Sequence, residues 1–131
     1  YTPFANGGVL DGRQLIGRTA LTRMGRVSAA TPDDATLMIP LRFAPGFMKA
    51  TDNRRIPGAV NSSLLLSEAA FGHVGAGGSV GFADPECRLG FGYAMNRMGT
   101  GLLLNSRGQA LVDAAYQALG YRDNDGGAWM A

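Results

Sequence analysis

The sequence has little of the chemistry that disulfides, metal sites and phosphate sites require. Its 131 residues include one cysteine, Cys87, and one histidine, His73. A single cysteine excludes a disulfide within the chain, and one histidine with scattered carboxylates gives no cluster of metal ligands. The Gly-x-x-x-x-Gly-Lys pattern of a phosphate-binding loop is also missing. We therefore expect no metal and no cofactor. We expect Cys87 to be an unreactive thiol, because no histidine lies near it in sequence.

Charge and long apolar runs are also scarce. Charged residues make up 17% of the chain, the net charge is +2, and Lys49 is the only lysine. The arginines are scattered apart from Arg54 and Arg55, whereas a nucleic-acid-binding protein is expected to carry a basic stripe. No apolar run approaches the roughly 20 residues of a membrane span. We predict neither a nucleic-acid partner nor a membrane span, and the compartment stays open between the cytoplasm and the cell envelope.

Glycine, by contrast, is abundant: the chain has 20, and they cluster within positions 72–81 and 90–92. Apolar residues alternate with small or polar ones over residues 79–83 and again over residues 88–95, which is the period of a half-buried strand. Asp84 and Pro85 between them favour a tight turn. We expect these two segments to be antiparallel neighbours. Because glycine-rich strands are weak alone, something must pack closely against them.

The entry to this hairpin combines a titratable ring with a backbone that is almost free of side chains. His73 lies on a strand that runs into Gly75, Ala76 and Gly77. Glycine allows close approach to the backbone and leaves its N–H groups accessible. A substrate carbonyl oxygen is therefore expected to bind there, although a hydrogen-bonded core histidine is the simpler alternative for His73.

Other patterns predict the remaining elements. The sequence predicts that residues 1–8 are the end of a helix and that residues 16–27 form a short helix. We expect loops at residues 29–40 and 52–58, and a loop with a helical turn at 59–70. An irregular or edge strand is expected around Pro45 and Gly46, because proline cannot donate to a sheet ladder. A further helix starts at Asn105 or Ser106 and ends at Gly120. Its apolar face is predicted from helical spacing: Leu111, Ala114, Ala115, Ala118 and Leu119. Residues 122–131 are expected to fray, unless Trp129 is held against the rest of the fold.

The glycine-rich stretch resembles a known family. His73-Val74-Gly75, the following Ala-Gly-Gly-Ser, the Asp-Pro turn and the strand ending in Tyr-Ala-Met-Asn-Arg-Met are similar to the C-terminal part of serine β-lactamase-related hydrolases. That family includes class C β-lactamases, D-alanyl-D-alanine carboxypeptidases and esterases. The resemblance implies an α+β fold: the C-terminal part of a β-lactamase/transpeptidase-like domain over residues 1–131, with an antiparallel sheet and a packed C-terminal helix.

The resemblance also implies roles for particular residues. His73-Val74-Gly75 stands at the family's third motif, which is Lys-Thr-Gly in β-lactamases and often His-x-Gly in esterases. His73 is then expected to line the pocket as a catalytic residue, and the Ala76 N–H to donate to the oxyanion. Val74, Gly75 and Gly77 are expected to bind substrate. Histidine in place of a lysine cation favours a small-molecule ester over a β-lactam with a carboxylate.

The nucleophile predicted by this resemblance is missing from the sequence. No serine is followed three residues later by a lysine, and the Tyr-x-Asn motif is absent. Ser79 lies in a Gly-x-Ser-x-Gly pattern, but a nucleophile elbow needs a strand, a turn and then a helix, and here a second strand follows. We therefore expect a fragment whose nucleophilic serine and lysine lie in the N-terminal half of the same fold. The alternatives are a non-catalytic binding piece, or a β-lactamase or D,D-peptidase.

Overall fold

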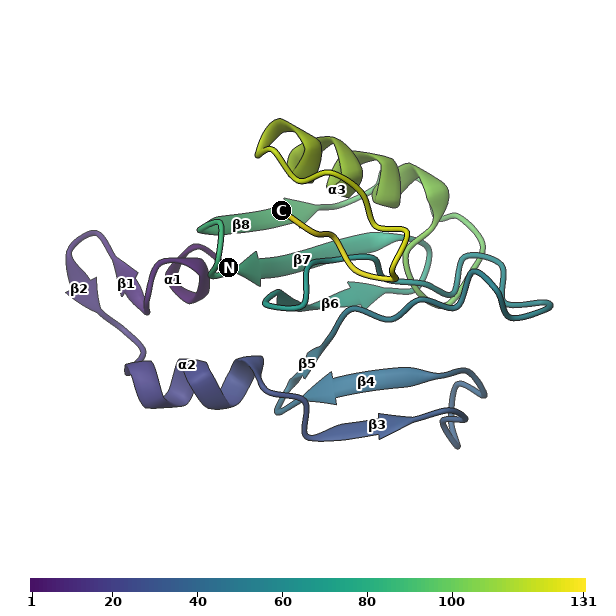
Figure 1. Cartoon of the computed structure of the whole chain (residues 1–131), viewed down its shortest axis with the longest axis horizontal. Helices are drawn as coiled ribbons and strands as arrows, with labels where there is room; N and C mark the ends of the chain where they lie inside the picture. The colour runs from purple at the N-terminus through teal and green to yellow at the C-terminus, as the bar shows by residue number, and fades with distance from the viewer.

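A six-stranded antiparallel sheet, with strand order β3-β4-β5-β6-β7-β8, forms the centre of the molecule. The structure is a computed structural model that describes residues 1–131. Helix α3 crosses one face of the sheet, while α1, α2 and the small β1–β2 hairpin lie toward its other side (Figure 1). The helices and strands have these bounds: α1 Thr2–Ala5, β1 Val9–Leu10, β2 Arg13–Gln14, α2 Arg18–Gly25, β3 Ala29–Thr31, β4 Leu41–Ala44, β5 Phe47–Met48, β6 Phe71–Gly75, β7 Ser79–Asp84, β8 Leu89–Tyr93 and α3 Ser106–Ala118.

The predicted glycine-rich hairpin is confirmed. Strands β7 and β8 pair antiparallel from Val80 opposite Tyr93 to Asp84 opposite Leu89. The Asp84 side chain accepts a hydrogen bond from the Glu86 N–H at 2.9 Å, which is the local bond expected of an aspartate that opens a turn. Strand β6, which carries His73, pairs with β7 along its whole length.

Two predictions for the first half of the sheet are wrong. Residues 29–31 were expected to be loop, yet they form β3, which pairs with β4. Pro45 and Gly46 do not interrupt one irregular strand; they form the turn between β4 and β5, where Phe43 pairs with Met48. Gly46 has a φ of +81°, which glycine adopts without strain. Residues 59–70 also contain no helical turn, and instead make isolated bridges such as Thr51 with Leu64.

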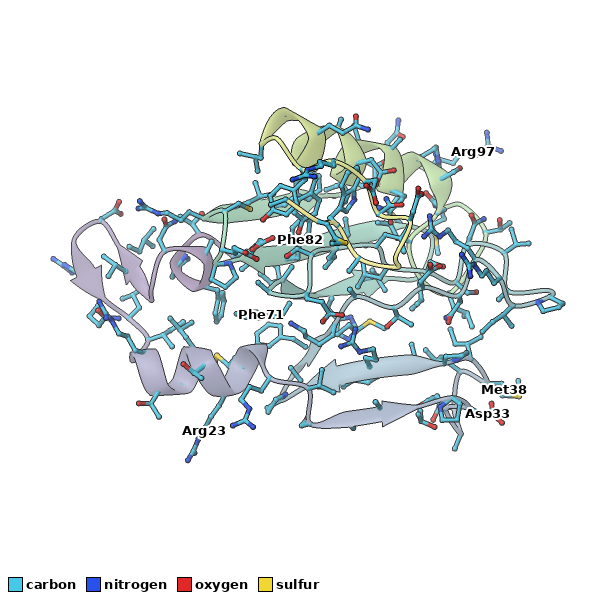
Figure 2. All side chains as sticks on the ribbon, viewed as in Figure 1. Arg23, Asp33, Met38, Phe71, Phe82 and Arg97 are labelled. Atoms are coloured by element: carbon cyan, nitrogen blue, oxygen red, sulfur yellow. The ribbon has the colours of Figure 1, made fainter.

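The apolar core lies mainly between the sheet and α3. Phe82 of β7 is fully buried there and stacks on Phe91 and on Tyr116, with ring centroids 5.1 and 6.0 Å apart. A smaller cluster on the opposite face gathers Phe71, Ala83 and Ala5. Figure 2 shows Phe82 and Phe71 on either side of the sheet. Both faces are therefore covered over part of their area.

Helix α3 begins where the sequence predicts, but it buries a different face. Asn105 is the N-cap, and its side chain accepts a hydrogen bond from the Gly108 N–H. Leu111 and Leu119, which were predicted to be core residues, are 46% and 48% exposed. The buried face instead consists of Gly108, Val112 and Tyr116. The large Tyr116 ring gains more from burial than the alanines do, and it determines the rotation of the helix.

The C-terminal residues do not fray, because Trp129 is held against the fold, which is the alternative that the sequence left open. Trp129 is only 4% exposed, and its ring lies against that of Tyr116 with centroids 5.6 Å apart. Its backbone N–H donates to the Leu66 carbonyl at 3.0 Å, and its indole N–H donates to Asp113 at 3.1 Å. A tryptophan with both an apolar contact and a hydrogen-bond partner can hold a polar segment in place.

A buried polar network joins α3 to the C-terminal end of strand β7, where Asp84 lies. The Asp84 carboxylate is fully buried, and it accepts hydrogen bonds from the Ser67 hydroxyl at 2.6 Å and the Tyr116 hydroxyl at 2.9 Å. The Tyr116 oxygen in turn accepts from the Ser67 N–H at 3.1 Å. Burial, together with the nearby Asp84 charge, raises the pKa of Tyr116 far above its ordinary value of 10.0.

This network predicts a change in stability at alkaline pH. Because the folded-state pKa of Tyr116 is raised above 10.0, its contribution to stability is complete below pH 10 and is lost as the pH rises above 10. Tyr116→Phe is expected to cost about 1–3 kcal/mol at pH 7, because Asp84 loses a buried donor. The difference in unfolding free energy between wild type and Tyr116→Phe should then shrink by up to about 1.4 kcal/mol per pH unit above 10. Urea unfolding of both proteins from pH 7 to 11.5 measures this difference in unfolding free energy. A difference that stays constant above pH 10 would contradict the account.

Candidate active site

His73 stands on the exposed part of the sheet rather than in the core. Its imidazole Nδ1 lies 2.7 Å from the Val74 carbonyl oxygen, and its ring centroid lies 6.5 Å from that of Phe43. A carbonyl can only accept, so Nδ1 carries a proton in this contact and Nε2 is the ring nitrogen left for another partner. The structure therefore disfavours the core alternative for His73 and gives it an accessible nitrogen.

The sheet opens beside His73. Strand β5 pairs with β6 through a single residue pair, Met48 with Gly72. Beyond that pair, β6 continues to Gly75 with β7 as its strand partner on the other side. Beyond His73, at Val74 and Gly75, one edge of β6 thus has no paired strand, and a strand edge of this kind can bind another molecule.

Ala76 is exposed in the turn that follows β6. The Gly78 N–H closes this turn by donating to the Gly75 carbonyl at 3.1 Å. No backbone or side-chain hydrogen bond of the protein uses the Ala76 N–H. An accessible, unpaired amide is the property that an oxyanion donor requires.

The other residues predicted to bind substrate differ in their surroundings. Val74 is half-buried and packs against the main core cluster, so its side chain serves the core, and substrate binding by Val74 stays a prediction. Gly75 ends β6, and a side chain there would overlap the Ser79 hydroxyl. Gly77 is buried, with a φ of +91°, and its carbonyl accepts two hydrogen bonds. The structure thus brings the predicted residues together in one strand and turn.

A buried lysine fixes the chain just before β6. Lys49 is 2% exposed, and its ammonium donates to the carbonyls of Glu68 and Ala70 at 2.6 and 2.7 Å. Burial lowers its pKa. The sequence shows Lys49 as the only lysine but gives no sign that it is buried. Its two bonds hold the segment that leads into His73.

Ser79 and Cys87 show no features of a nucleophile. Ser79 begins a strand rather than standing between a strand and a helix, so the geometry of a nucleophile elbow is not formed. Its hydroxyl makes no hydrogen bond with His73. Burial and the neighbouring Asp84 raise the pKa of the Cys87 thiol, which keeps it in the less reactive protonated form.

Sequence reasoning assigned Asn105 a role only as a helix cap. The structure places its amide against the glycine-rich turn, 2.9 Å from the Gly77 carbonyl oxygen. A cavity of about 340 Å³ lies on its other side, between residues 54–65 and the start of α3, and neither His73 nor Ala76 lines it.

No group of three or more His, Cys, Asp or Glu side chains is placed to hold a metal ion. No helix has the length and apolar character needed to cross a membrane.

Comparison with known proteins identifies the fold. No family profile matches the chain. The structure superposes on a family VIII carboxylesterase with a TM-score of 0.71 and 38% sequence identity, over 89% of this chain and 29% of that one. A penicillin-binding protein homolog from Caulobacter crescentus gives a TM-score of 0.72 and 32% identity over the same shares. The chain is homologous to part of a serine β-lactamase-related hydrolase.

A curated relative supports the same relationship. The chain is 34% identical over 98 residues to the esterase/beta-lactamase LipL of Mycobacterium tuberculosis (strain ATCC 25618 / H37Rv), which is 75% of this chain and 20% of that protein. The predicted α+β fold, part of a β-lactamase/transpeptidase-like domain, is therefore confirmed. The chain spans between a fifth and a third of the length of these serine β-lactamase-related hydrolases.

Proposed function

We propose that this chain forms one wall of the active site of a serine hydrolase that transfers the acyl group of a carboxylic ester to water. The observation that carries the proposal is the unpaired Ala76 N–H, in the turn that directly follows His73 and Gly75 of β6. In the β-lactamase-related hydrolases, one donor to the oxyanion comes from the residue after the motif glycine, and Ala76 holds that position here. The names of two similar proteins, a carboxylesterase and an esterase/beta-lactamase, support this reaction class.

In the proposed reaction, a serine outside residues 1–131 attacks the ester carbonyl, and a lysine near it accepts the serine proton. The carbonyl oxygen becomes negative in the tetrahedral intermediate, and the Ala76 N–H donates to it. The ester C–O bond then breaks, the alcohol leaves with the proton that the lysine accepted, and water attacks the acyl-serine to release the acid and restore the serine. His73 Nε2 accepts a hydrogen bond from a donor in the pocket, because Nδ1 is already committed to Val74. Gly75 and Gly77 keep the wall free of side chains, so that the substrate can approach the backbone.

An ester fits this site better than a β-lactam. The third motif of β-lactamases provides a lysine cation, whereas this chain has a histidine there, whose Nδ1 is already engaged with the Val74 carbonyl. A neutral imidazole gives little attraction to the carboxylate of a β-lactam. The expected preference is measured by comparing kcat/KM for p-nitrophenyl butyrate and for nitrocefin in the full-length protein. Faster turnover of nitrocefin would support the β-lactamase alternative instead.

His73→Ala is expected to lower kcat/KM for p-nitrophenyl butyrate on the order of 10²-fold, which is the range for a residue that assists proton transfer. His73→Gln, which keeps an acceptor and a donor near the same positions, should recover part of the loss. Thermal unfolding provides the control, because an exposed side chain contributes little to stability. If wild type and His73→Ala hydrolyse the ester at equal rates, His73 has no part in the mechanism.

A further inference from the structure

The Gly77 carbonyl is held by two donors that come from outside the glycine-rich turn. The Gly99 N–H and the Asn105 side-chain amide each donate to it at 2.9 Å. Asn105 is 5% exposed, and its other side-chain atom, Oδ1, accepts from the Gly108 N–H at 3.2 Å. One side chain thus caps α3 and binds the turn that follows β6.

The space around the Asn105 amide is made by glycines. A Cβ added at Gly78 would lie 2.6 Å from Asn105 Cγ, and one added at Gly99 would lie 3.4 Å from it. A helix cap alone does not require this arrangement, because serine, threonine or aspartate would cap α3 equally well. The additional function of asparagine is its Nδ2 donor, which aspartate lacks and serine is too short to place at Gly77.

The clamp on Gly77 determines where the Ala76 N–H points. Fixing Gly77 fixes the neighbouring Gly78 N–H, which donates to the Gly75 carbonyl at 3.1 Å. The peptide bond between Gly75 and Ala76 is trans, so its C=O and N–H point in opposite directions. Because the Gly75 oxygen points into the turn, the Ala76 N–H points away from the turn, toward the exposed side.

We infer that Asn105 is a positioning residue for ester hydrolysis, acting through Gly77 and Gly78 to aim the Ala76 N–H at the oxyanion. This inference rests on the proposed function, because it assumes that the Ala76 N–H binds the oxyanion. Loss of the clamp displaces the donor rather than removing it. The effect should therefore fall on kcat, with little change in KM for the ground-state ester.

The test uses Asn105→Asp and Asn105→Ser in the full-length protein, since both keep an oxygen that caps α3. Each is expected to lower kcat for p-nitrophenyl butyrate on the order of 10-fold, with KM within about 2-fold and a melting temperature lowered by a few degrees, because a buried donor is lost. Amide hydrogen exchange of Gly78 should become faster in both variants. Arg107→Ala is the matched control, because it removes another bond from the first turn of α3, to the Arg97 carbonyl at 2.9 Å, without touching Gly77.

The outcomes separate this inference from the proposed function. If Ala76→Pro lowers kcat while both Asn105 variants retain wild-type kcat, the Ala76 donor stands and the inference is wrong. If Ala76→Pro leaves kcat unchanged, the proposed function fails first. A fall in kcat of the Asn105 variants that Arg107→Ala reproduces would overturn the positioning role. The positioning role is supported if both Asn105 variants show faster amide exchange at Gly78 and lower kcat while Arg107→Ala shows neither.

Discussion

Replacing Ala76 by proline is expected to lower kcat for a p-nitrophenyl ester by about 10²–10³-fold, which corresponds to roughly 3–4 kcal/mol of transition-state stabilisation. Proline has no backbone N–H, so the proposed oxyanion donor is removed and the carbonyl is kept. The preceding Gly75 lies in an extended strand, which is the conformation that a residue before proline prefers. The substitution is therefore expected to fit the turn.

A matched variant separates the amide from the side chain. Ala76→Ser adds a hydroxyl on an exposed residue and keeps the N–H, so its kcat should stay within about 2-fold of wild type. Both variants are assayed with the full-length protein, and melting curves check that they fold equally well. A proline variant that folds normally and retains wild-type kcat would exclude Ala76 as an oxyanion donor.

Adding one methyl group at Gly72 is expected to destabilise the fold severely. A Cβ there would lie 2.5 Å from Phe82 Cα and even closer to the Gly81 carbonyl oxygen, both of which are backbone atoms of the paired strand. Backbone atoms in the middle of a sheet cannot move aside as a flexible side chain can. Gly72→Ala should therefore cost about 3 kcal/mol or more of unfolding free energy, at the upper end for overpacking.

Gly92→Ala provides the comparison for Gly72→Ala. Gly92 also lies in a strand, but no atom lies within 4 Å of a Cβ built on it. Its replacement should change the unfolding free energy by less than about 1 kcal/mol, and the lower entropy of the unfolded chain favours alanine. Urea denaturation of the two variants measures the contrast. Equal midpoints for wild type and Gly72→Ala would show that the strands can separate at this point.

The glycine-rich hairpin could be predicted from sequence because its signals are local. Alternation in residues 79–83 and 88–95, with the Asp84-Pro85 turn signal between them, indicated that the two segments pair antiparallel, as they do. The buried face of α3 could not be predicted in this way. Helical spacing favoured Leu111 and Leu119, while the observed face follows Tyr116, whose hydroxyl bonds to Asp84 far along the chain. Contacts between distant segments decided between two faces that spacing alone could not distinguish.

The candidate site shows the same division. His73 and Ala76 stand out in the sequence because they flank a glycine and match a family motif. The bond from Asn105 to Gly77 joins residues 28 positions apart, and no pattern in the sequence reports it. Lys49 is similar, because a lone lysine gives no sign that it is buried against Glu68 and Ala70. Residues that act through others are found only once the chain is folded.

The central claim is that the Ala76 N–H faces the oxygen that becomes negative during acyl transfer. The most direct measurement is a crystal structure of the full-length protein inactivated with an alkyl p-nitrophenyl phosphonate, whose phosphoryl oxygen occupies the position of the oxyanion. The account predicts that this oxygen lies about 2.7–3.1 Å from Ala76 N, with His73 beside the same pocket. A phosphonate bound elsewhere, or bound with its oxygen turned away from Ala76, would contradict it.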